Sequence, residues 1–249
     1  MKLLAAQPKL VEQVHEAIVA EISAGKLKPG ARVIQEQIAK VLGVSRQPVQ
    51  QAVLLLRNQG VLRDAPGRGS IVAPLDLDHV SNMYDLRAVI EGLACRKAAQ
   101  RNAQRAKKPG QTLIQAGRKA VASGSVVAMI AADLKFHDFI YALSENPLIA
   151  STMEAQWVYI QRVMGEVLMR DELPRAIWDQ HEAMLDAVMA GDGATAEALA
   201  REHITHAAMA MISRLRSEVV PSSDDTATSR SSPALRPARR AGRAASSQL

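Results

Sequence analysis

Apolar residues recur with helical spacing shortly after a turn near residue 43. One stripe of this spacing predicts the buried back of a helix: Val49, Ala52, Val53 and Leu56. Ser45 stands where a hydroxyl can cap the first turn of that helix, and Gly60 stands where a left-handed residue can end it. The opposite face carries only basic and amide side chains: Arg46, Gln47, Gln50 and Gln51. The pattern therefore predicts a helix with an apolar back and a hydrogen-bonding front.

The chain around this helix predicts a small domain. Similar stripes predict two helices before it, over 8–25 and 36–42. Two short apolar runs after it predict strands at 61–63 and 70–73, joined by a glycine-rich turn with Arg68 at its tip. Three helices followed by a basic hairpin make a winged helix-turn-helix, which we assign to residues 1–73.

Residues 74–80 form a linker, and the pattern beyond it is helical almost throughout. Breaks at proline, glycine and serine divide it into six predicted helices, over 79–101, 110–122, 125–144, 147–170, 174–190 and 194–217. Helices of this length with short loops pack as an antiparallel bundle, which we assign to residues 81–219. Residues 220–249 are rich in Ser, Arg, Ala and Pro, which predicts a disordered basic tail. The fold class is therefore mainly α, with a winged helix followed by an antiparallel α-helical bundle.

The amino-acid composition favours a helical protein and excludes some kinds of site. The 249 residues are 48% hydrophobic but only 3% aromatic, and abundant Ala, Leu and Met favour helix over sheet. The single cysteine, Cys95, excludes an internal disulfide and a cysteine-rich zinc module, so we expect it to be a small buried filler. No apolar run reaches the length of a membrane span and the start lacks signal-peptide character, so we expect a cytoplasmic protein without membrane association.

Positive charge is concentrated at the two ends of the chain. Residues 1–72 hold ten Lys and Arg against five acidic residues, a net charge of +5. The net charge of residues 73–220 is −2 and that of residues 221–249 is +3. A basic N-terminal domain attracts phosphate, so double-stranded DNA is the expected partner of the winged helix. The basic tail either adds phosphate contacts or is an inert extension.

A helix with an Arg and Gln front can read base edges in the major groove of DNA. We expect Arg46 to contact a base or a phosphate, and Arg68 to reach the minor groove or the backbone from the hairpin tip. Supporting contacts are expected from Ser45, Gln47 and Gln50. A plain solvated helix face is the alternative interpretation of the glutamines.

Three histidines and one carboxylate lie on apolar stripes of the predicted bundle helices: His137, His181, His203 and Asp133. Asp133 and His137 are four residues apart and share one helix face. Neutral imidazoles with a carboxylate suit a divalent ion, with zinc expected first and nickel or manganese also compatible. Core histidines hydrogen-bonded to carbonyl groups would give the same pattern, and spacing alone leaves both interpretations open.

The N-terminal motif resembles a known family. The run Leu42-Gly43-Val44-Ser45-Arg46-x-Pro48-Val49, followed by Gly60-x-Leu62, is similar to the winged-helix domain of GntR-type bacterial transcription regulators. One departure is Gln50, where many relatives have Arg. Because Gln prefers adenine where Arg prefers guanine, the resemblance implies an operator that differs from the commonest family site.

The segment Asp85-Leu86-Arg87-x-x-x-Glu91, together with the three histidines and Asp133, resembles the all-helical FCD-type ligand-binding domain of the FadR subgroup. The resemblance implies that those four residues hold a divalent metal and that Arg87 binds a small organic acid beside it. An ion pair with Glu91 is the alternative for Arg87, and His206 faces either the same cavity or the surface. The resemblance also implies a ligand-responsive homodimer on a near-palindromic operator, with repression the expected sign.

Two other functions are compatible with parts of this pattern. A metal-dependent enzyme tethered to DNA could activate water at an open metal position, but no nucleophile motif or suitably spaced general base is evident, so we expect no enzymatic activity. A ligand-independent DNA-binding protein with a structural bundle would bind DNA equally well with and without small molecules.

Overall fold

The computed structural model describes residues 8–168 and 174–217. The first part of the chain is a winged helix composed of α1 (Pro8–Ser23), β1 (Arg32–Val33), α2 (Gln35–Leu42), α3 (Arg46–Asn58), β2 (Leu62–Asp64) and β3 (Ser70–Val72). The three strands form one antiparallel sheet in the order β1-β3-β2. The predicted hairpin is confirmed. The strand β1 is not predicted by the sequence, because two residues are too few to show strand alternation.

Packing turns the apolar stripe of α3 toward the domain interior. Val49, Ala52 and Leu56 are completely buried in one core with residues of α1. Gly43 makes the turn before α3, with a φ of 66° in the left-handed region that favours glycine. Ser45 takes the predicted N-cap position with an extended backbone, but its side chain does not make the predicted capping hydrogen bond. The hydroxyl is exposed, and water can satisfy the free N–H groups of the first turn instead.

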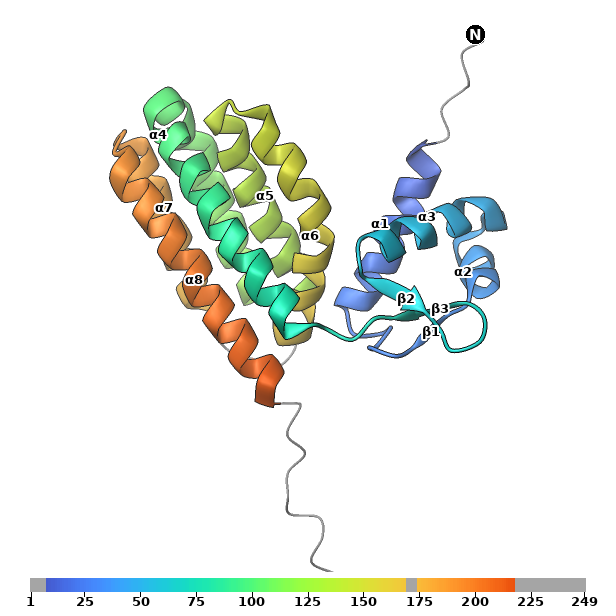
Figure 1. The fold of residues 1–249 in the computed structure, drawn as a ribbon. Helices are drawn as coiled ribbons and strands as arrows, with labels where there is room; N and C mark the ends of the chain where they lie inside the picture. Colours follow the sequence, from blue (N-terminus) through green and yellow to red (C-terminus); the bar gives the residue numbers. More distant parts are fainter. Residues whose placement is uncertain (1–7, 169–173, 218–249) are drawn as a thin grey trace, which may run out of the picture.

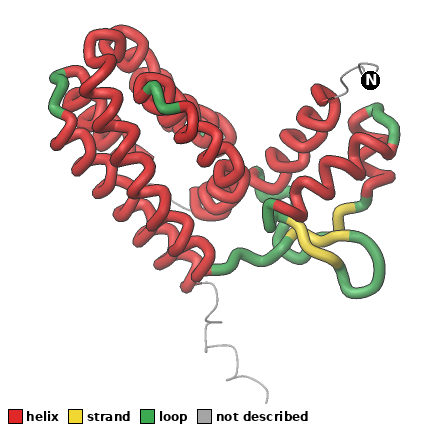
Figure 2. The backbone as a smooth tube through the Cα atoms, turned by 45° about the horizontal axis from the view of Figure 1, so that its top comes forward, coloured by secondary structure: helices red, strands yellow, loops and turns green. Residues whose placement is uncertain are grey.

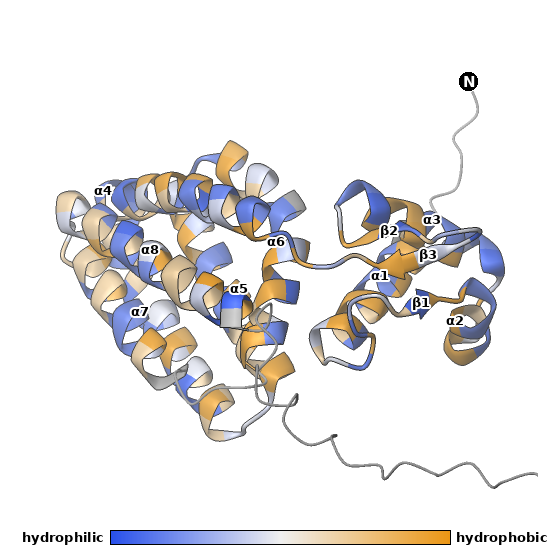
Figure 3. Cartoon of the chain, turned by 60° about the horizontal axis from the view of Figure 1, so that its bottom comes forward, coloured by the Kyte–Doolittle hydropathy of each residue, from blue (hydrophilic) through white to orange (hydrophobic). Residues whose placement is uncertain are grey.

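The second part of the described chain is a helical bundle of α4 (Leu77–Ala122), α5 (Val126–Ser144), α6 (Pro147–Leu168), α7 (Pro174–Met189) and α8 (Gly193–Ser217). Figure 1 shows these helices packed side by side, and Figure 2 shows a single segment joining them to the winged helix. Hydrophilic and hydrophobic residues alternate along each helix (Figure 3), so each helix can bury one stripe in a shared core. The predicted order of a winged helix and then a helical bundle is confirmed.

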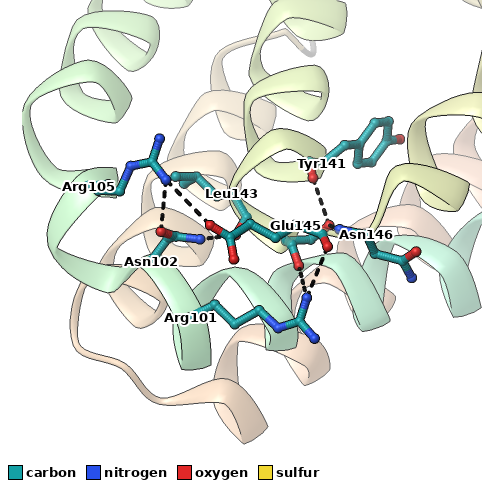
Figure 4. Close-up of polar contacts among 8 residues, drawn as sticks. Arg101, Asn102, Arg105, Tyr141, Leu143, Glu145 and Asn146 are labelled. Atoms are coloured by element: carbon teal, nitrogen blue, oxygen red, sulfur yellow. Dashed lines mark hydrogen bonds and ion pairs between the residues drawn. The ribbon is translucent and has the colours of Figure 1, made fainter.

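The break in α4 lies at a different place from the predicted one. The sequence around Pro109 predicts a break at 108–110, yet Pro109 lies inside the helix. The helix is interrupted at Asn102, whose φ of −138° and ψ of 29° are non-helical. The Asn102 side chain donates to the Leu143 carbonyl at 2.7 Å, and Arg101 donates to two further carbonyls at the end of α5 at 3.0 Å (Figure 4). These contacts between helices fix the position of the kink, and the local sequence does not encode them.

Three further expectations bear on the rest of the chain. Among the described residues, no helix has both the length and the apolar character needed to cross a lipid bilayer. Cys95 is a buried free thiol in the bundle core, as expected, and burial raises its pKa. The predicted tail at 220–249 and the last residues of the predicted helix 147–170 lie outside the described residues.

Candidate metal centre and nucleic-acid interface

The three histidines proposed as metal ligands meet inside the bundle. His137 comes from α5, His181 from α7 and His203 from α8, and their ligating nitrogens all lie within 4.8 Å of one another. The Nε2 atoms of His181 and His203 are 3.2 Å apart. The side chains converge because each lies on the stripe that its helix turns toward the core, and their exposed fractions are only 2, 0 and 5%.

Asp133 lies one helical turn before His137 on α5. Its carboxylate oxygens lie 3.6 Å from Nε2 of His181 and 3.8 Å from Nε2 of His137. Burial raises the pKa of the Asp133 carboxyl, and the charges of His137 and Arg87 oppose that shift. The structure therefore brings the three imidazoles together and places the carboxylate beside two of them, His137 and His181.

Hydrogen bonds on the far side of two imidazoles determine which nitrogen faces the cluster. Nδ1 of His203 lies 2.7 Å from Oε1 of Gln180. Because that oxygen only accepts, Nδ1 carries the proton and Nε2 keeps its lone pair. Nδ1 of His137 contacts the Glu91 carboxylate, so its Nε2 is the nitrogen that faces the cluster. Outer partners of this kind orient the histidines of metal sites.

The surroundings keep two of the imidazoles neutral. Burial, reinforced by the charges of His137 and Arg87, lowers the pKa of His203 to about 3. Burial and the neighbouring His203 and His137 also lower the pKa of His181 well below its usual range. Neutral imidazole is the form that binds metals. Two Nε2 atoms 3.2 Å apart can share only one proton, whereas a divalent cation can accept both lone pairs, so this donor set fits such an ion.

Arg87 and Glu91 form a buried ion pair beside the cluster. The Arg87 Nε lies 2.5 Å from the Glu91 carboxylate, and one terminal nitrogen of Arg87 lies 3.1 Å from Nε2 of His137. Burial alone would raise the pKa of Glu91, but the charges of His137 and Arg87 outweigh it and hold that pKa far below its usual range. The ion pair considered as an alternative for Arg87 is present, and the same guanidinium also adjoins the histidine cluster.

His206 does not join this cluster. It lies three residues after His203 on α8, but it is exposed and lies 3.8 Å from the exposed carboxylate of Glu202. Of the two orientations that the sequence left open, the structure shows the surface one.

The proposed DNA-reading residues lie together on α3. Ser45, Arg46, Gln47 and Gln50 are all exposed around the start of that helix. Arg46 forms an ion pair with Glu36 of α2 at 2.9 Å, and both side chains are more than two-thirds exposed. Because exposed ion pairs contribute little free energy, this one leaves Arg46 available for DNA.

The tip of the hairpin presents Arg68 to solvent. Its carbonyl accepts a hydrogen bond from Arg32 at 3.2 Å, and a second nitrogen of Arg32 donates to the Pro66 carbonyl at 3.3 Å. Arg32 thus braces the loop that carries Arg68. This role could not be predicted from the sequence, because no local pattern shows that β1 lies beside the hairpin.

Together, a winged helix with a basic recognition face and a buried ligand cluster in a helical bundle define a two-domain DNA-binding regulator. Two family profiles match the corresponding parts of the chain: "Bacterial regulatory proteins, gntR family" over residues 10–72 and "FCD domain" over residues 82–206. The chain belongs to the GntR family of bacterial transcriptional regulators and carries an FCD domain. Its family identifies it as a regulator of transcription and not as an enzyme.

Individual relatives agree with this assignment. The chain is 27% identical over 195 residues, 78% of its length and 85% of the relative's, to a probable D-xylose utilization operon transcriptional repressor of Paenarthrobacter nicotinovorans. It is 28% identical over 149 residues, 60% of its length and 67% of the relative's, to the transcriptional regulator McbR of Escherichia coli. The solved structure of Escherichia coli McbR superposes with a TM-score of 0.73 at 23% identity, covering 88% of this chain and all of that one. That likeness supports the fold.

Proposed function

We propose that this chain is a ligand-responsive repressor whose bundle binds a divalent metal and a small organic acid, and whose affinity for a near-palindromic operator changes when the acid binds. The observation that carries the proposal is the buried cluster of three histidine imidazoles, with the Asp133 carboxylate beside two of them. In this proposal residues 1–73 bind DNA and residues 81–219 bind the ligands and dimerise. The linker between them is shorter than the predicted 74–80, because α4 already begins at Leu77. Residues 220–249 are an extension.

Four residues would hold the metal: Asp133, His137, His181 and His203. Zinc is the first choice because it favours imidazole with a carboxylate, and nickel or manganese would also accept this set. When bound, the ion would supply a positive centre that attracts the carboxylate of an organic acid. Gln180 and Glu91 support the ligand assignment, since each holds the outer nitrogen of one histidine.

The charges around the cluster indicate what else it can bind. When all three imidazoles are neutral, as metal binding requires, the nearby charged side chains Arg87, Glu91 and Asp133 leave one net negative charge in a buried site. A divalent cation changes this to one net positive charge, which a carboxylate anion would neutralise. Arg87 is the residue we assign to that anion, because its guanidinium already lies 3.1 Å from Nε2 of His137.

The winged helix supplies the output of the proposed sensor. Two copies in a homodimer would place their α3 helices in successive major grooves, which predicts a near-palindromic site. Arg46, Ser45, Gln47 and Gln50 would contact the groove, and Arg68 would contact the backbone or the minor groove. Repression is proposed because a relative similar over 78% of this chain is described as a repressor. A regulator of bacterial DNA acts in the cytoplasm.

The proposal is tested by the melting temperature of chelator-stripped full-length protein, with Zn²⁺, Ni²⁺ and Mn²⁺ crossed against small organic acids. Ligands that bind only the folded state raise stability by mass action, so a metal should raise the melting temperature and one class of acid should raise it further. The same acid should then change affinity for an operator selected from random duplexes. A metal response that no acid extends, with unchanged DNA affinity, would favour a purely structural bundle.

Gln180 provides a test of the ligand assignment that leaves all four ligands in place. Gln180→Leu removes the acceptor that orients His203, so Zn²⁺ binding should weaken by about 10- to 100-fold. Calorimetric titration of the stripped protein measures this change. Gln180→Glu keeps an acceptor at the same place and should bind Zn²⁺ at least as tightly as the wild type. Equal affinity in the leucine variant would contradict the role assigned to Gln180.

A further inference from the structure

One bundle helix, α6, contacts both the metal cluster and the DNA-binding domain. In Figure 1 it is the helix of the bundle that lies next to α1. Its residues divide between two faces, because positions three, four and seven apart share one side of a helix. Trp157, Ile160 and Met164 are buried in the core of the bundle. Val158, by contrast, packs against the core of the winged helix.

The inner face of α6 lies against the ligand cluster. The indole ring of Trp157 lies 4.8 Å from the guanidinium carbon of Arg87, a distance typical of a cation–π contact. The same ring lies 5.5 Å from the ring of His137. Because Trp157 contacts both groups, a change in the position of Arg87 or His137 would act directly on α6.

The outer face of α6 holds the segment that connects the two domains. Arg162 donates to the carbonyl of Ala73, the first residue after β3. The Tyr159 hydroxyl accepts from the backbone N–H of Asp76 at 3.3 Å, and the Tyr159 ring packs against His79 at 4.7 Å. Asp76 also caps α4 by accepting from two N–H groups of its first turn. Two side chains of α6 thus fix the path of the chain between the winged helix and the bundle.

The outer face also touches α1 at the level of the backbone. Gly165 lies so close to Ser23, the last residue of α1, that a Cβ atom at Gly165 would lie 2.8 Å from the Ser23 Cα. Side chains cannot yield there, because the neighbouring atoms are backbone. The contact between α6 and α1 therefore depends on the absence of a side chain at Gly165.

Where α6 meets the winged helix and the linker, two buried polar groups have no hydrogen-bond partner among the described residues: one terminal nitrogen of Arg162 and the Ser23 hydroxyl. Arg162 is only 3% exposed, and its other terminal nitrogen donates to a backbone carbonyl. Burial lowers the pKa of this side chain, and the nearby Tyr159 and Glu166 oppose that shift. Leaving a buried donor unpaired costs free energy, so the docked state has less net stability than its contact area suggests. A small change at the ligand cluster can then shift the balance between docked and undocked domains.

We propose that α6 couples the ligand cluster to the DNA-binding domain, with Arg162, Tyr159 and Gly165 as the contacts that hold the domains docked. This inference rests on the proposed function, since it names how occupancy of the same site reaches the DNA. A shift of the single helix α6 is sufficient for this coupling. The coupling predicts that metal occupancy changes the protection of the linker against hydrogen exchange.

Hydrogen exchange of the full-length protein tests the coupling, with Zn²⁺ alone as the probe. In the wild type, Zn²⁺ should slow exchange of peptides covering 73–80 and 18–25 by about fivefold or more. Gly165→Ala inserts a methyl group against the Ser23 backbone, and Arg162→Met removes the donor to Ala73 while keeping a long side chain. Both variants should bind Zn²⁺ within about twofold of wild-type affinity yet lose the exchange response. Arg162→Met should fold well, because it replaces a poorly paired buried cation by an apolar chain.

Gly92→Ala is the matched control. It adds the same methyl group within a helix, but its nearest neighbours are the flexible side chains of Arg201 and Glu197. It should keep both Zn²⁺ binding and the exchange response. The coupling alone would be overturned by either of two results. In the first, the wild type binds Zn²⁺ without a change in hydrogen exchange. In the second, both test variants bind Zn²⁺ and keep the full exchange response. Failure of the wild type to bind Zn²⁺ would overturn the proposed metal site and the coupling with it.

Discussion

Zn²⁺ at one hundred times its Kd is expected to raise the melting temperature of the stripped protein by roughly 5–10 °C, and His181→Leu should abolish this shift. The ion would stabilise only the folded state, because its ligands come from α5, α7 and α8 and meet only in the packed bundle. His181 is the most suitable ligand to replace. It is completely buried, its Nδ1 has no hydrogen-bond partner, and its ring stacks on Phe136, where a leucine of similar volume can pack.

His206→Leu is the control for this experiment. It makes the same substitution on α8 at an exposed residue outside the cluster, so the Zn²⁺ shift should stay at its wild-type size. A full shift in His181→Leu would contradict the ligand assignment. Absence of a shift in the wild type would mean that the cluster consists of ordinary core histidines, with the DNA-binding half of the proposal unaffected.

Arg46→Ala is expected to weaken binding to the selected operator by about 10- to 100-fold while changing nonspecific binding little. Arg46 is exposed in the first turn of α3, where recognition helices contact base edges. Its ion pair with Glu36 is exposed, so the free protein pays little to release the guanidinium. Fluorescence anisotropy measures binding to the selected duplex and to a scrambled duplex at several salt concentrations. The comparison separates the sequence-specific contribution to affinity from the electrostatic contribution.

Arg57→Ala removes the same charge from the other end of α3 and serves as the comparison. Arg57 lies in the last turn of the helix and pairs with Asp64 of β2 at 2.7 Å. Operator affinity should change by no more than about threefold in this variant. Equal losses in the Arg46 and Arg57 variants would show that charge, and not a base contact, explains the effect of Arg46.

Local pattern predicts most of the fold because most of its elements are amphipathic helices. The spacing of Val49, Ala52 and Leu56 specifies the buried face of α3 without any knowledge of its neighbours. The kink in α4 shows where this approach fails. Pro109 is the residue that predicts a break, but the helix is interrupted at Asn102, whose amide bonds to a carbonyl on α5. A contact between two helices decided the geometry against the local signal.

The candidate site, like the fold, is predictable from the sequence only in part. Helical periodicity places His137, His181 and His203 on inward faces, and the structure brings them together. The partners of the outer nitrogens follow from packing between helices and have no signal in a single sequence. Gln180 precedes His181 along the chain yet bonds to His203 of another helix. For the same reason the sequence gives no sign that Arg162 holds the linker at Ala73.

The position of the tryptophans gives the molecule a built-in optical reporter. The chain has two tryptophans, and both lie beside the ligand cluster. Trp157 lies 5.5 Å from the ring of His137, and Trp178 lies 4.8 Å from the ring of His181. The winged helix contains none. Intrinsic emission excited at the indole band therefore reports on the bundle interior alone, and titrations of ions or acids can be followed without a label even while DNA is bound.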